Sequence, residues 1–244
     1  MEATSLISVL KKHQSAFHPV VPFNPAKEKL YAFDFTENNK ELTTEQIANT
    51  ESFANYLNAQ LKNHECKYGI GGYNEHRTLY ARSKHFDAAS KVSPAGGNAE
   101  EAEPRRLHLG TDIWGPTGTK IMSPLDGIVH SFAFNNNDSD YGATIILTHN
   151  IEGVSFNTLY GHLSLNSIKN LYEGKRITPG EVFTEFGMRF ENGNWPPHLH
   201  FQIIGDMQNW QGDYPGVCKW SEREDYLKNC PDPDIILQLM QFAR

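Results

Sequence analysis

The sequence predicts a mainly β fold: an antiparallel sandwich- or barrel-like core, with helices in the N-terminal region and a helix near the C-terminus. After residue 105, short runs of β-branched and aromatic residues alternate with turn signals such as Gly115-Pro116 and Pro179-Gly180. Helical signals lie before and after this stretch. With 244 residues, the chain can bury about 70% of its surface and needs no disulfide to fold.

The N-terminal region, residues 1–91, carries both helix and strand signals. Residues 6–17 place apolar side chains at helical spacing, and residues 31–35 alternate as a half-buried strand does. The Thr-x-x-Gln pattern at residues 43–46 is a capping box, and the apolar stripe that follows predicts a helix to about Asn63.

A polar segment from Val92 to Pro104 separates this region from the β-rich core. Its two glycines, two prolines and three glutamates predict a surface loop. We therefore expect four parts: an α+β region at residues 1–91, a loop at 92–104, the β core at 105–205 and a helical extension at 206–244. For the first part the sequence leaves open a lid or a regulatory role.

The core and the extension contain the remaining predicted elements. In the extension, Ser221 with Glu224 suggests another capping box, and Asp232 followed by Pro233 suggests the start of a terminal helix. The predicted strands of the core are residues 120–122, 127–134, 143–148, 154–160, 182–186 and 200–204.

Composition excludes several classes of function. The formal net charge is −7 and there is no basic stripe, which argues against a nucleic-acid partner and against docking on anionic membranes. No apolar run is long enough to span a bilayer, and the N-terminus lacks the charge order of a secretory leader, so a cytoplasmic location is expected. The three cysteines are expected to be reduced thiols. Nothing in the sequence indicates an oligomeric state.

Four histidines and one aspartate have spacings that suggest a shared site. His108 and Asp112 flank Gly110 in a segment that disfavours a helix, and their even spacing in an extended chain points both to one face. His198 and His200 share one face of a predicted strand, and His162 lies at a strand end. Imidazole and carboxylate are zinc ligands, and three of them with an open fourth position form a catalytic site.

These motifs also carry a resemblance to a known family. The segments HLGTDIWGPTGTKIMSPLDGIV, YGATIILTH, LYGHLS, GKRITPGEVF and PHLHFQI resemble, in this order, the lysostaphin-type zinc metallopeptidases, which include glycyl-glycine endopeptidases and cell-wall hydrolases. The resemblance covers about residues 108–204. It implies one Zn²⁺ per chain, held by His108, Asp112 and His200, with His162 and His198 as the catalytic histidines beside the metal-bound water. Which of His162 and His198 is the general base stays open.

One segment departs from the family pattern. The loop GMRFENGNWPP before the last strand is longer and bulkier than the small-residue loop of the family. Arg189, Phe190 and Trp195 are expected at the edge of the groove, so a preference for polyglycine does not carry over. The resulting hypothesis is a zinc metalloendopeptidase that hydrolyses peptidoglycan-type or other short peptides, such as imported muropeptides, through a metal-activated water.

Two other classes of function stay open. A non-catalytic relative could use the same groove for binding or scaffolding, and two histidines with one carboxylate also form the iron site of non-haem oxygenases. All three ligands and both catalytic histidines are present, which argues against the non-catalytic relative. The two histidines beyond the ligand set, and the absence of an evident cosubstrate site in the sequence, argue against the oxygenase.

The segment from Gly69 to Ser83 also has two interpretations. It could be a lid that brings Arg77 or Arg82 to a substrate carboxylate, or that brings Asn74 or His76 to the metal. A solvated loop with ordinary ion pairs is the simpler expectation.

Overall fold

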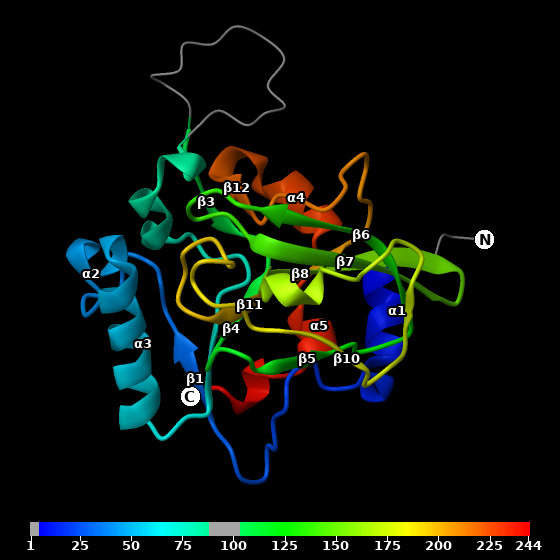
Figure 1. Cartoon of the computed structure of the whole chain (residues 1–244), viewed down its shortest axis with the longest axis horizontal. Coiled ribbons are helices and arrows are strands. Elements are labelled where there is room, and N and C mark those ends of the chain that lie inside the picture. Colours follow the sequence, from blue (N-terminus) through cyan, green and yellow to red (C-terminus); the bar gives the residue numbers. More distant parts are fainter. Residues whose placement is uncertain (1–4, 88–102) are drawn as a thin grey trace, which may run out of the picture.

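An eight-stranded sheet forms the centre of the structure (Figure 1). The structure is a computed structural model and describes residues 5–87 and 103–244. The β1–β2 pair is parallel and the other neighbouring strands are antiparallel, so the sheet is mixed. In spatial order, its strands are β1 (Leu30–Phe33), β2 (Tyr68–Gly71), β4 (Thr111–Trp114), β11 (His198–Ile204), β8 (Val154–Leu163), β7 (Gly142–Ile151), β6 (Gly127–Asn135) and β9 (Arg176–Ile177).

Two small antiparallel sheets accompany the large one. The first pairs β10 (Val182–Glu185) with β5 (Lys120–Met122), and the second pairs β12 (Val217–Lys219) with β3 (Arg105–His108). Every strand predicted for the core is found, with bounds shifted by up to three residues. The predicted mainly β fold is therefore confirmed. Since the large sheet runs from β1 at one edge to β9 at the other, it does not close into a barrel within the described residues.

The helices lie mainly in the two terminal parts of the chain (Figure 1). The α-helices are α1 (Leu6–Lys12), α2 (Thr44–Ala48), α3 (Thr50–Asn63), α4 (Arg223–Asn229) and α5 (Asp234–Leu237). Short 3₁₀ helices span Gln14–Ala16, Thr78–Arg82, Lys84–Phe86, Leu165–Ser167, Trp220–Glu222 and Met240–Phe242. None of the helices in the described parts of the chain is long and apolar enough to cross a bilayer.

The first capping box is confirmed, but the helix after it is divided. Thr43 and Gln46 cap each other's backbone at the start of α2, as predicted. Asn49 then leaves the helical conformation, and its side chain accepts a hydrogen bond from the backbone N–H of Ser52. An asparagine that can cap a helix therefore starts α3 within the predicted single helix.

The capping box predicted at the C-terminal end is wrong. Ser221 lies inside a 3₁₀ turn and donates its hydroxyl hydrogen bond to Glu103 instead. The terminal helix exists, and Asp232 accepts a hydrogen bond from the N–H of Asp234. That helix has only four residues, because Gln238 adopts a left-handed conformation at its end (φ 52°). A tertiary contact and a backbone turn thus override the local helix signals.

The N-terminal region contributes directly to the central sheet. β1 and β2 extend it beyond β4, with Gly71 opposite Asp112. Behind these strands an aromatic cluster, which includes Phe33, Phe35 and Phe53, packs the α3 helix against Trp114. The predicted loop 92–104 lies almost wholly outside the described residues, and the division of the chain into four parts stays a prediction.

Candidate metal centre and its surroundings

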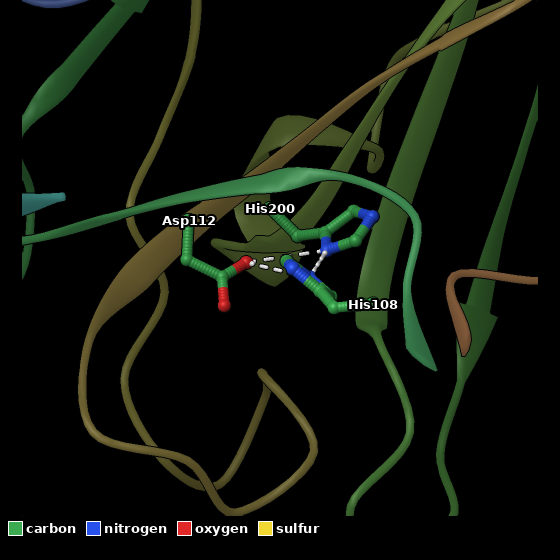
Figure 2. A group of neighbouring side chains, drawn as sticks. All are labelled: His108, Asp112 and His200. Atoms are coloured by element: carbon green, nitrogen blue, oxygen red, sulfur yellow. Dashed lines mark hydrogen bonds and ion pairs between the residues drawn. The ribbon is translucent and has the colours of Figure 1, made fainter. Parts of the chain in front are cut away.

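The side chains of His108, Asp112 and His200 meet at one point (Figure 2). Asp112 and His200 come from the neighbouring strands β4 and β11, and His108 comes from β3 in one of the small sheets. In the β4–β11 pair, His200 lies directly opposite Asp112. His108 is the last residue of β3. Nδ1 of His200 lies 2.9 Å from Nε2 of His108 and 3.2 Å from Oδ1 of Asp112. The third distance, between Nε2 of His108 and Oδ1 of Asp112, is 3.3 Å.

The convergence of His108 and Asp112 has a different cause from the one expected. They do not share the face of one extended strand, because β3 pairs with β12 and β4 pairs with β11. A turn at Leu109 and Gly110 connects the two strands and brings the side chains together. At Gly110, a Cβ atom would lie 2.5 Å from both Cε1 and Nε2 of His200, so a glycine is needed for the close approach.

The outer hydrogen bonds of the two imidazoles define which nitrogens face each other. A carbonyl oxygen can only accept, so Nδ1–H of His108 donates to the backbone oxygen of Gly72 (2.9 Å). Likewise Nε2–H of His200 donates to the side-chain oxygen of Gln202 (2.9 Å). The Gln202 amide is oriented by its NH₂ group, which donates to the backbone oxygen of Pro215.

Two imidazole lone pairs and one carboxylate oxygen therefore face a common point. Such atoms repel one another at these distances unless a proton or a cation lies between them. Two imidazole nitrogens and a carboxylate oxygen are the donor set of many zinc and other transition-metal sites. The residues present thus fit a bound divalent ion.

Burial favours the neutral form of His108, and Arg77 favours the ionised form of Asp112. His108, Asp112 and His200 are almost fully buried. Burial, with the charge of Arg77, lowers the pKa of His108 to about 3. Burial alone would raise the pKa of Asp112, but His108 and the Arg77 guanidinium hold it well below its usual range. Neutral imidazoles and an ionised carboxylate are the protonation states that bind metal.

His162 and His198 lie together beside this cluster. Their rings stack with centroids 4.0 Å apart, and Trp114 stacks on the other side of His198 at 3.8 Å. Nδ1–H of His162 donates to the backbone oxygen of Asn192, and Nδ1–H of His198 donates to that of Pro196, both at 2.8 Å. Each ring is therefore fixed with Nε2 as its acceptor nitrogen.

The backbone of His162 is strained. Its φ of 63° lies in the left-handed region, which costs a side chain roughly 1–2 kcal/mol. Its backbone N–H donates to Tyr141 and its carbonyl accepts from Gly187, and these bonds hold the conformation. Burial lowers the pKa of His162 well below its ordinary value and that of His198 to about 4, so both rings are neutral near pH 7.

A cavity of about 170 Å³ opens beside the cluster. Asp112, His162, His198 and His200 line it, and Tyr141 is among the residues that form its wall. Four of the five predicted site residues therefore line one cavity. The fifth, His108, packs against His200, with ring centroids 4.8 Å apart.

The structure contradicts the expected position of Trp195 in the loop before β11. Trp195 is buried, with 3% of its surface exposed, and it lines the cavity wall beside His162 and His198 instead of its edge. Phe190 is 71% exposed and Arg189 is also exposed, and neither lines this cavity, so their expected position at the edge of the groove stays a prediction. The loop folds back because Asn192 bonds to the backbone of Gly187 and of Trp195, which anchors both of its ends.

The segment 69–83 contacts the centre and lines part of its cavity through Arg77, Leu79 and Tyr80. Arg77 is buried and forms an ion pair with Asp112. Arg82 packs over the Trp195 ring at 4.5 Å and donates to Thr50. Asn74 accepts a hydrogen bond from Arg223, and the ring of His76 packs against Trp220. Neither Asn74 nor His76 is part of the metal cluster.

Sequence reasoning missed two residues that contact His200. Gln202 lies two residues along the same strand, so the alternation that groups His198 with His200 also points Gln202 to that face. The Tyr141 hydroxyl lies 3.4 Å from Nε2 of His200. It comes from the turn before β7, and no motif in the sequence relates it to the histidines.

Part of the chain is similar to known peptidases. Residues 106–211 match the model of peptidase family M23. The chain is similar to the L-Ala--D-Glu endopeptidase of Bacillus subtilis (strain 168), with 27% identity over 179 residues, which are 65% of this chain and 52% of that protein. The chain thus spans about half the length of this curated relative.

Two solved structures are also similar. The catalytic domain of the antimicrobial peptidase lysostaphin from Staphylococcus simulans is 21% identical, with 71% of this chain and 96% of that chain covered and a TM-score of 0.39. A zinc-containing peptidase from Vibrio cholerae is 24% identical, with 46% of this chain and 31% of that chain covered and a TM-score of 0.33.

Proposed function

We propose that this protein is a zinc-dependent metalloendopeptidase of the lysostaphin-like family, because residues 106–211 match the model of peptidase family M23. The convergence of Nε2 of His108, Oδ1 of Asp112 and Nδ1 of His200, all within 4.8 Å of one another, carries the proposal. These three residues would hold one Zn²⁺ per chain. When bound, the ion supplies a Lewis acid that polarises the scissile carbonyl and promotes ionisation of a water.

The two stacked histidines are the proposed catalytic residues. His162 and His198 enter the reaction neutral, so either Nε2 can accept a proton from the attacking water and return it to the leaving amine. The ring that accepts this proton then carries an Nε2–H, which can donate a hydrogen bond to the developing oxyanion before the proton passes to the leaving amine. The other ring stacks on it, with centroids 4.0 Å apart, and holds its position. Their Nδ1–H bonds to backbone oxygens hold both rings in place for these tasks.

Peptidoglycan-type or other short peptides are the proposed substrates. The Bacillus subtilis relative is named for cleavage between L-Ala and D-Glu, which supports this class of substrate. Trp114 and Trp195 give the cavity an apolar wall next to the histidines, and such a wall suits an extended peptide backbone and excludes water.

Metal analysis of the purified protein tests the proposal. The wild-type protein should contain about one zinc per chain, and the His108→Ala and His200→Ala variants should lose it. His162→Ala should retain zinc and lose hydrolysis of a muropeptide substrate. His64→Ala, which removes an exposed histidine on α3's C-terminal side, is the matched control and should behave as wild type. Iron with oxygen consumption would replace the peptidase with an oxygenase, and a protein without any metal would favour a scaffolding role.

A further inference from the structure

Arg77 contacts the centre from outside the matched M23 domain, which begins at residue 106. Only 1% of its surface is exposed. Its Nη1 donates to Oδ2 of Asp112 (2.5 Å) and to the Tyr80 hydroxyl (3.3 Å), and its Nε donates to Oε2 of Glu75 (2.6 Å). The guanidinium also packs over the Phe35 ring, with its central carbon 5.2 Å from the ring centroid.

The two oxygens of Asp112 therefore have different partners. Oδ1 faces His108 and His200, whereas Oδ2 accepts the hydrogen bond from Arg77. A carboxylate can bind a metal with one oxygen or with both, and the second mode occupies an additional coordination position. We propose that Arg77 is a positioning residue of the metal centre, which limits Asp112 to coordination through Oδ1 and so preserves a position for water. This inference rests on the proposed zinc-dependent function.

Orientation, more than net charge, is what Arg77 contributes. Glu75 offsets the guanidinium charge through its own ion pair, so the Glu75–Arg77 pair is close to neutral as a unit. What reaches Asp112 is a directed hydrogen bond from a rigid planar group. A lysine is a point charge on a flexible stem and cannot donate to Asp112 and Glu75 with the same geometry.

A cobalt-substituted protein reports the coordination directly, because the visible absorption of Co²⁺ weakens as its coordination number rises. Arg77→Lys should lower the intensity of this absorption and weaken zinc affinity roughly 10–100-fold in a chelator competition. Glu75→Gln breaks the other ion pair of the same arginine but leaves the bond to Asp112, so its cobalt spectrum should match the wild type. Arg176→Lys, at an exposed ion pair with Asp126, controls for the substitution itself.

The outcomes separate this inference from the proposed function. A wild-type protein that binds neither zinc nor cobalt would overturn both. A metal-loaded wild type whose cobalt spectrum and zinc affinity are unchanged in Arg77→Lys would overturn only the role of Arg77. Should Arg77→Lys fail to fold, a crystal structure of the zinc-loaded wild type decides. One short metal–oxygen contact from Asp112, with Oδ2 still on Arg77, supports the inference, and two short contacts refute it.

Discussion

The contact between Gly110 and His200 makes the proposed metal centre sensitive to a single methyl group. The backbone of Gly110 is outside the left-handed region, so alanine is allowed there by conformation. Its Cβ, however, would lie 2.5 Å from two ring atoms of His200, and 2.8 Å from the backbone oxygen of Phe201. Ordinary contact begins at 3.4 Å, so the imidazole must move by roughly 0.9 Å.

A shift of this size is large for a catalytic centre. Misplacement by about 1 Å can reduce a rate about 100-fold, while overpacking costs about 1–3 kcal/mol in the free energy of unfolding. We therefore expect Gly110→Ala to fold, and to lose about two orders of magnitude in kcat/KM on a peptidoglycan-type peptide. Zinc affinity, measured by chelator competition, should also fall.

Gly118→Ala provides the control. A Cβ at Gly118 has no atom within 4 Å, and its φ of 77° imposes a backbone cost of about 1 kcal/mol without touching the site. This variant should lose some stability in urea unfolding but retain zinc affinity and kcat/KM. If Gly110→Ala retains wild-type zinc affinity and activity, the steric argument is refuted.

Two further predictions concern the pH dependence of stability and the support of His200. Burial lowers the pKa of His149 to about 4 in the folded protein, whereas in the unfolded chain this histidine binds its proton near pH 6.5. The fold therefore has its full stability from the neutral ring above pH 6.5 and loses this contribution as the pH falls from 6.5 to 4. The loss amounts to about 3 kcal/mol in the free energy of unfolding. Measured by urea unfolding, this free energy should fall less steeply between pH 6.5 and 4 in His149→Asn than in the wild type. Equal pH dependence in both proteins would exclude His149 as the cause. Gln202→Leu removes the acceptor for Nε2–H of His200 and should weaken zinc affinity roughly 10–100-fold in a chelator competition. An unchanged affinity would show that Gln202 does not hold the ring.

The sequence predicts much of the β core, because strand alternation and turn residues are local signals. The proximity of His198 and His200 on one face follows from the two-residue period of a strand. The same argument correctly predicts that His108 and Asp112 lie close together, but its reason is wrong. The two residues lie on different strands, which a turn at Gly110 connects. The position of the third ligand came from the family resemblance and not from spacing.

Contacts between distant segments could not be predicted from local patterns. Arg77 and Asp112 are 35 residues apart, and their pairing depends on β2 lying next to β4. A sequence rich in glycine, tyrosine and arginine suggested exposure, but this arginine is buried because two carboxylates and an aromatic ring surround it. Likewise Trp195 is buried because hydrogen bonds between the side-chain amide of Asn192 and the Trp195 backbone fold the loop inward.

The pairing of β2 with β4 also governs how the chain can be shortened. A fragment trimmed to the matched residues 106–211 would leave β4 as an unprotected edge, with its backbone N–H and C=O groups available to other chains. Aggregation of such a truncated fragment would say nothing against the peptidase, since the cut removes both a neighbouring strand and the basic partner of Asp112. Expression trials should therefore keep the residues from β1 onward.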